Sequence, residues 1–430
     1  MIFVSRRPKS LAHIGEEITI PHSGRPKNND RLVLLMSSSV EAIVKPELLV
    51  WARESAGLTI EDAARKASLA VEKLESCERG EMRLTVPQLR KLAKVYKRPL
   101  AVFYLSKPPK TFDALRDFRR LPGGAPVVES PQLKLEIRRA IYRRKMALEM
   151  YDDLGYQPPQ LTTVASLADD WEALAERIRR LLSVSDEDQT SFKDQYEALS
   201  RWRSAIEDAG ALVFQTTGVE VGEMRGFSIS EVTLPVIVIS GKDSPSGRIF
   251  TMLHEFAHLL LRQGGLCNLQ EKGKQTEESR VEVFCNGVAG ATLVPGELLA
   301  KHPLVSGRKK GVHWKDEEIW ALARSFQVSR DVILRRLLIN HLVTKEFYDS
   351  KRERLLQEYE SASRSGGFTT PDKKAIAMSG RAFVRLVLNS YYQEKITLSD
   401  VSDFLDVRLK WLPQIEKAVR GSMAEVGVAD

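Results

Sequence analysis

The sequence predicts a mainly helical, multidomain chain of the α+β class. Its 430 residues are too many for one simple core, and at about 150 residues per domain they suggest roughly two to four domains. Amphipathic helical patterns lie on both sides of one short β-rich stretch that begins after Gly210. With 43% hydrophobic and 28% charged residues, the composition is typical of a globular protein in water.

The cellular setting predicted from composition is the cytoplasm. No run of 18 apolar residues occurs, so we expect no membrane span and no membrane partner. The first 25 residues have no long apolar segment typical of a secretory signal. Three widely spaced cysteines, Cys77, Cys267 and Cys285, argue against a disulfide framework and for a reducing compartment.

Residues 1–40 are polar and show no sustained hydrophobic period, so we expect a disordered N-terminal extension. Regular patterning begins after Met36, and we hypothesise that translation starts near this methionine. Residues 41–106 then show five short helical patterns with tight joints, with Thr59 and Thr85 as N-caps and Gly57 and Gly80 as stops. Such helices can bury one small core, and the second and third form a helix-turn-helix.

Residues 107–209 are expected to hold a Pro/Gly-rich linker followed by a helical region with one long basic helix that Ser130 caps. Between residues 97 and 150 there are 13 Lys and Arg against 5 Asp and Glu, which accounts for the whole net charge of +8. A basic field of this kind suits double-stranded DNA, and a solvated helix face is the alternative. The candidate contact residues on this helix are Arg138, Arg139, Arg143 and Arg144.

The β-rich runs "ALVFQTTG", "MRGFSIS" and "LPVIVIS" predict a small three-stranded sheet at the start of a domain over residues 210–345. Further helices follow, one of them stopped by Pro295. Residues 346–380 are expected to be a helix and a flexible linker, which begins at Gly366, and residues 381–430 a C-terminal helical region.

The stretch "RIFTMLHEFAHLLLRQ" carries two histidines and a glutamate inside an apolar run. Positions four apart lie on one face of a helix, so His254 and His258 can present two imidazoles to one ion. Glu255 lies about 100° round the helix, close enough to reach a water on that ion. Burying these three polar side chains would be costly without a metal, so the pattern predicts Zn²⁺.

A third protein ligand is required, and the sequence offers several. A third histidine six residues after His258 is absent, because Gly264 stands there. Glu282 lies inside an otherwise apolar helical segment, and Asn286, one turn later, could orient a ligand. The alternatives to Glu282 as the third ligand are Cys285, His302 and His313.

These residues predict a zinc metallo-endopeptidase. Zinc lowers the pKa of a bound water towards roughly 7, and Glu255 is placed to accept its proton and pass it to the leaving amine. We expect the strand "LPVIVIS", just before the motif, to be an exposed edge that holds an extended substrate by strand addition.

Residues 210–342 resemble the ImmA/IrrE family of metallopeptidases, through "MRGFS", "PVIVIS", "FTMLHEFAHLLL" and "VEVFCNGVAGATLVP". The resemblance implies a zincin-like domain with zinc ligands His254, His258 and Glu282 and a general base at Glu255. Residues 46–106 are similar to a Cro/repressor-type (Xre) helix-turn-helix. Ser240 and Cys77 depart from the two family patterns. Family members typically cleave a repressor and so relieve repression, which makes a repressor the expected protein substrate.

The predicted recognition helix, "AVEKLESCERG", is a poor match for DNA. Its candidate contacts to DNA or to a partner protein, Lys73, Ser76 and Arg79, stand among three glutamates. Two alternatives to the peptidase therefore stay open. One is a DNA-binding transcriptional regulator whose peptidase-like domain is a sensor, and the other is a toxin–antitoxin-like interaction module.

Overall fold

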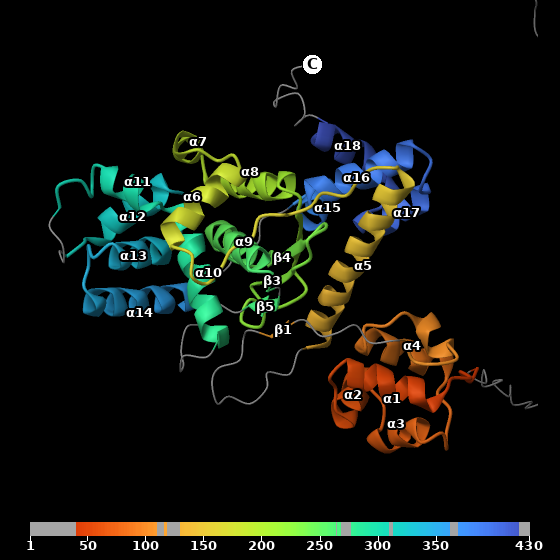
Figure 1. The fold of residues 1–430 in the computed structure, drawn as a ribbon. Coiled ribbons are helices and arrows are strands. Elements are labelled where there is room, and N and C mark those ends of the chain that lie inside the picture. Colours follow the sequence, from red (N-terminus) through yellow and green to blue (C-terminus); the bar gives the residue numbers. More distant parts are fainter. Residues whose placement is uncertain are drawn as a thin grey trace, which may run out of the picture.

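A computed structural model describes residues 40–109, 116–117, 130–263, 265–267, 277–308, 313–361 and 369–420. The chain is mostly helical with one small mixed sheet, as the predicted α+β class requires (Figure 1). The predicted N-terminal extension, the position of Met36 and the centre of the Pro/Gly-rich linker lie outside the described residues. No helix in the described ranges combines the length and apolar character needed to cross a bilayer.

The N-terminal module has its own small core, formed around Leu74, Leu89, Tyr96 and Phe103, which are fully buried. The five predicted helices are present: α1 (Pro46–Ser55), α2 (Ile60–Ala67), α3 (Val71–Glu78), α4 (Val86–Val95) and the 3-10 helix η1 (Leu100–Tyr104). Thr59 and Thr85 cap α2 and α4 as expected, and each accepts a backbone N–H. Whether α3 reads DNA stays a prediction.

The three predicted strands, β2, β3 and β4, lie side by side at one end of a five-stranded sheet, with β2 at its edge. Its strand order is β1-β5-β3-β4-β2. The strands are β1 (Arg116–Asp117), β5 (Gly265–Cys267), β3 (Gly226–Ile229), β4 (Val236–Ser240) and β2 (Leu212–Thr216). The expectation that the "LPVIVIS" strand is an exposed edge is wrong, because β4 pairs with β3 on one side and with β2 on the other. A buried central strand has no backbone left for strand addition.

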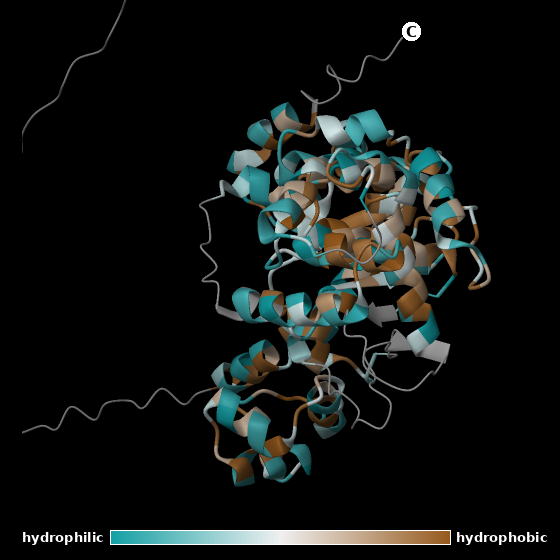
Figure 2. Ribbon diagram, turned by 90° about the vertical axis from the view of Figure 1, so that its left-hand side faces the viewer, coloured by the Kyte–Doolittle hydropathy of each residue, from teal (hydrophilic) through white to brown (hydrophobic). Residues whose placement is uncertain are grey.

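Helices cover both faces of the sheet. On β2, Val213 belongs to a core shared with α8 (Gln195–Asp208) and α9 (Pro245–Leu260), whereas Leu212 and Phe214 face the opposite side. That second side is covered by α5 (Pro131–Asp153) and the C-terminal helices. They are α15 (Pro371–Ser379), α16 (Arg381–Tyr392), α17 (Leu398–Leu405), η2 (Leu409–Trp411) and α18 (Leu412–Arg420). The most hydrophobic segments accordingly lie inside the larger body, which comprises the sheet and the helices on its two faces (Figure 2).

The C-terminal helices therefore share a core with the sheet. The structure also has helix α15 at residues 371–379, where a flexible linker was expected. Arg203 and Glu207 link α8 to the C-terminal helices. Arg203 donates to the Ala377 carbonyl at 2.6 Å, and the Glu207 carboxylate accepts the Ala382 N–H at 3.1 Å. Most of the remaining helices contribute to the core that contains α8 and α9. They are α6 (Trp171–Leu181), α7 (Asp186–Ser191), α10 (Glu277–Leu293), α11 (Gly296–Lys301), α12 (Asp316–Ser325), α13 (Arg330–Ile339) and α14 (Lys345–Ser361).

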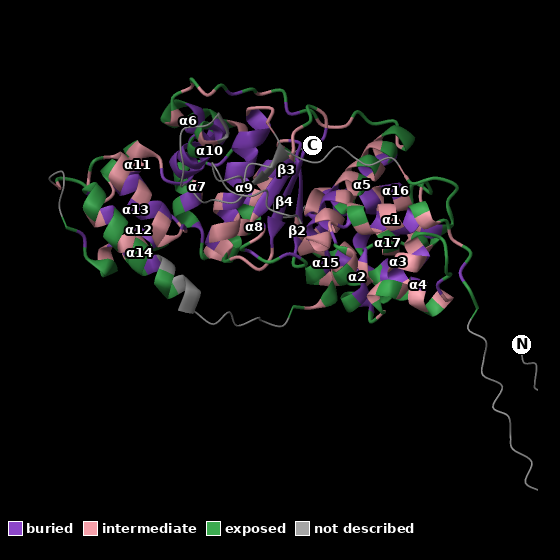
Figure 3. Cartoon of the chain, turned by 90° about the horizontal axis from the view of Figure 1, so that it is seen from below, coloured by how far each residue is buried: buried purple, intermediate pink, exposed green. Residues whose placement is uncertain are grey.

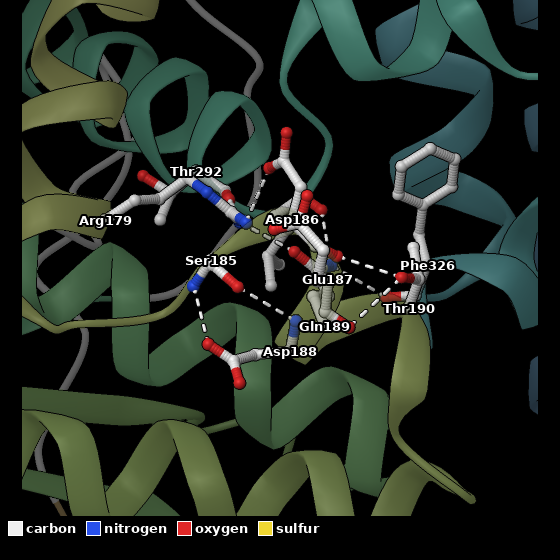
Figure 4. A network of polar contacts seen from close by, with 10 residues as sticks. Arg179, Ser185, Asp186, Glu187, Asp188, Gln189, Thr190, Thr292 and Phe326 are labelled. Carbon is white, nitrogen blue, oxygen red and sulfur yellow. Dashed lines mark hydrogen bonds and ion pairs between the residues drawn. The ribbon is translucent and has the colours of Figure 1, made fainter.

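A buried polar network holds the C-terminal end of α10 (Figure 4). Arg179 donates to the Thr292 carbonyl at 2.9 Å and to Gln189 at 2.6 Å. Gln189 donates in turn to the Leu293 carbonyl at 2.7 Å and to the Phe326 carbonyl at 3.0 Å. The last carbonyls of a helix have no partner within the helix, and a cation near them is favourable. The network therefore fixes the helix that carries Glu282.

Gln189→Leu is expected to destabilise the chain by about 2 kcal/mol, because the carbonyls of Leu293 at the end of α10 and of Phe326 at the end of α12 lose their donor. Urea unfolding of the full chain at matched zinc concentration measures the effect. Thr190→Ala is the control, since Thr190 is exposed and its hydroxyl bonds only within α7. Equal unfolding midpoints for the two variants would show that the network does not stabilise α10.

Candidate metal centre

Helix α9 brings the two histidines and Glu255 into the interior. Its start is fixed by Ser244, whose side chain accepts the Gly247 N–H at 3.1 Å, and by Pro245 in the first turn. Every residue from 251 to 260 is buried, as the apolar run predicts. Helix α9 accordingly lies at the buried centre of the larger body (Figure 3). His254, Glu255 and His258 are fully buried.

The side chains of three residues meet between α9 and α10. His254 Nε2 and His258 Nε2 lie 3.1 Å apart. His254 Nε2 lies 3.4 Å from Glu282 Oε2, and His258 Nε2 lies 3.3 Å from Glu282 Oε1. Tetrahedral zinc with bonds of about 2.0–2.1 Å holds its donor atoms roughly 3.3 Å apart. Both Glu282 oxygens are buried and accept no hydrogen bond from the described residues. Two imidazoles and one carboxylate therefore form a possible metal site.

The charge of Glu282 suits a cation. Burial alone would raise the pKa of its carboxyl, but the facing imidazoles of His254 and His258 lower this pKa to about 2. Helix α10 packs along α9 and α6, and Gly287 lets it approach the Trp171 ring, which lies 2.5 Å from where a Cβ would stand. The sequence did not indicate this close packing, which places Glu282 opposite the histidines.

The surroundings of the site orient its imidazoles. His258 Nδ1 lies 3.1 Å from the Gln263 carbonyl, so Nδ1–H can donate to it and leave Nε2 as the ligand atom. A backbone carbonyl has no sequence signature, and this contact could not have been predicted. Asn286 is buried one turn after Glu282, on the same face of α10, and its role in orienting a ligand stays a prediction.

The alternative third ligands do not join the cluster among the described residues. Burial raises the pKa of the Cys285 thiol well above its usual value, which disfavours the thiolate that a metal needs. His302 accepts the Leu304 N–H at 3.2 Å with Nδ1 and contacts Ser325 with Nε2. His313 packs edge-on against Phe347 with ring centroids 5.3 Å apart.

The candidate DNA or partner contacts lie in two places. Arg79, directly after α3, is exposed but pairs with Glu75 and Glu81 and donates to Ser76, whereas Lys73 on α3 is half-buried.

On α5, three of the four candidate arginines contact other parts of the protein. Fewer positive charges are therefore free to contact a phosphate than the sequence count indicates. Arg144 donates to the Thr233 carbonyl at 2.9 Å, and the Arg143 guanidinium lies 5.2 Å from the Phe214 ring. Arg138 donates to the Lys97 carbonyl at 3.0 Å and so joins the N-terminal module to α5. Arg139 is exposed and pairs with Glu136.

Comparison with known proteins matches the part of the chain that holds this centre. Residues 206–338 match the family model of the IrrE N-terminal-like domain. This range includes β2, β3, β4, α9 and α10. No curated protein matches the chain. The domain with the His254, His258 and Glu282 cluster is thus similar to a family of zinc-dependent metallopeptidases.

Proposed function

We propose that this protein is a zinc-dependent endopeptidase that cleaves a regulatory protein, most simply a repressor, and so controls transcription. The observation that carries the proposal is the pair of imidazole nitrogens 3.1 Å apart, each 3.3–3.4 Å from one carboxylate oxygen of Glu282, with the buried carboxylate of Glu255 on the neighbouring face of α9. The match of residues 206–338 to a peptidase family supports the same conclusion.

Each residue of the site has a chemical role in this proposal. His254, His258 and Glu282 would hold zinc, which as a Lewis acid makes water a nucleophile near neutral pH. Glu255 accepts the proton of the attacking water and delivers it to the amine that leaves. The buried setting strengthens these charge interactions, because little water competes for them. Glu255 is therefore a catalytic residue and not a ligand.

We propose that the module of residues 41–106 brings the peptidase to its target. Glu72 and Glu75 on α3 would repel a phosphate backbone, and three of the four α5 arginines contact other parts of the fold. These charges favour a protein target over DNA for this module. Pull-down of the target with zinc-loaded Glu255→Gln protein, in the presence and absence of duplex DNA, separates the two.

Removal of zinc is expected to abolish cleavage and to lower the melting temperature. A ligand present at 100 times its dissociation constant stabilises the folded state by about 2.7 kcal/mol, and chelation removes that contribution. Metal analysis should find one zinc per chain, lost on treatment with a chelator and regained with added zinc. His254→Ala should contain none. The control is His341→Asn, at an exposed position with φ 58°, which asparagine adopts readily. Zinc retention by His254→Ala would contradict the proposal.

A further inference from the structure

Gly226 lies where strand β3 comes closest to α9. A Cβ built on this glycine would lie 2.5 Å from Thr251 Cγ2, 3.1 Å from Glu255 Oε1 and 3.1 Å from the Val238 carbonyl oxygen. Carbon atoms in contact are ordinarily about 3.5–4.0 Å apart. No side chain fits at this position unless a neighbour moves.

Space, and not backbone conformation, explains the glycine. Gly226 is not among the described glycines with positive φ. It stands in a regular antiparallel pair, opposite Ile239 of β4. An alanine could adopt this backbone without strain. The role of Gly226 therefore depends on the two α9 side chains that pass over it.

These two side chains differ in how readily they can move. Thr251 and Glu255 are four residues apart and share the face of α9 that meets β3, whereas His254 and His258 meet Glu282 of α10. Thr251 is β-branched and stiff at χ1, and it is buried. The Thr251 methyl group cannot move far enough by itself to admit a methyl group at residue 226. The added methyl group therefore displaces α9 and the Glu255 carboxylate together.

We propose that Gly226 is a positioning residue that sets where the Glu255 carboxylate lies relative to the metal centre. This inference rests on the proposed function. A general base must lie about 2.6–3.2 Å from the atom whose proton it takes. Since a misplacement of 1 Å can cost about 100-fold in rate, a shift of about half an ångström should cost about 10-fold.

The test is Gly226→Ala in the full chain, measured without any protein substrate. Acetohydroxamic acid binds a metal centre as its anion, and its proton passes to the nearest base. Its affinity for the cobalt-substituted protein, followed by visible absorption, therefore reports the position of Glu255. Gly226→Ala should bind one metal ion per chain like wild type but bind acetohydroxamate about 10-fold more weakly. Gly222→Ala is the matched control, because a Cβ there meets no atom within 4 Å.

A second substitution separates positioning from general damage. Thr251→Ser removes Cγ2, the atom closest to the added methyl, so Gly226→Ala/Thr251→Ser should recover most of the lost affinity. If Gly226→Ala does not fold, the double variant and Thr251→Ser make the same comparison. Wild-type affinity in Gly226→Ala, or no recovery in the double variant, would overturn the inference. If instead Glu255→Gln left acetohydroxamate binding unchanged, the proposed function itself would fail.

Discussion

Glu255→Gln is expected to keep zinc and to lose cleavage by about 100- to 10,000-fold, which is the usual contribution of a positioned general base. Glutamine has nearly the same volume, so the packing of α9 against β3 is preserved. It cannot accept the proton of the attacking water. The three proposed ligands are untouched, so metal content should equal that of wild type. Zinc analysis and the proteome-wide appearance of new N-termini in cells measure the two effects.

The matched control for this substitution is Glu297→Gln, because the Glu297 side chain is 91% exposed on α11 and has only a surface partner. Both variants remove one negative charge, but only Glu255→Gln removes the buried base. If cells with Glu255→Gln showed the same cleavage products and the same relief of repression as wild type, the peptidase proposal would be wrong. The protein would then act as a sensor that binds its target without cutting it.

The metal centre could be predicted because its chemistry is local. The spacing of His254 and His258 puts two imidazoles on one helix face, whatever the rest of the fold does. Glu282 could be proposed because a carboxylate inside an apolar helical segment needs a partner. The structure brings the three together, although they come from two helices joined by a segment that lies partly outside the described residues. Their role as ligands stays a prediction.

The arrangement of the sheet could not be predicted because strand pairing is not local. The "LPVIVIS" run gives no indication of its neighbours, and β2 and β3 occupy both of its edges. The sequence predicts a linker at the position of helix α15 because residues 366–380 are rich in Gly, Ser and Lys. This segment is helical where it packs beside β2 and the end of α8. Tertiary packing, rather than propensity, decides such a segment.

The number of charged residues in a segment does not predict which of their side chains are exposed. The basic stretch around α5 suggests a surface that binds phosphates. However, Arg144 donates to two backbone carbonyls, and the Arg143 guanidinium packs over an aromatic ring. Long arginine side chains often lie along the fold and hydrogen-bond to it. Gly226 shows the same limit at the site, because only the placement of Thr251 and Glu255 gives this glycine a role.

Glu282→Ala is expected to weaken zinc binding by more than about 100-fold, since loss of a residue that only supports a ligand already costs 10- to 100-fold. Without the carboxylate, two buried imidazoles 3.1 Å apart remain as the only donors of this cluster, and the charge that attracts the cation is gone. Competition with a chelator of known affinity measures the change. Cys285→Ser is the control, because Cys285 is buried three residues further along α10 and stays a neutral thiol. If Cys285→Ser lost zinc and Glu282→Ala kept it, the third ligand would be the sulfur and not the carboxylate.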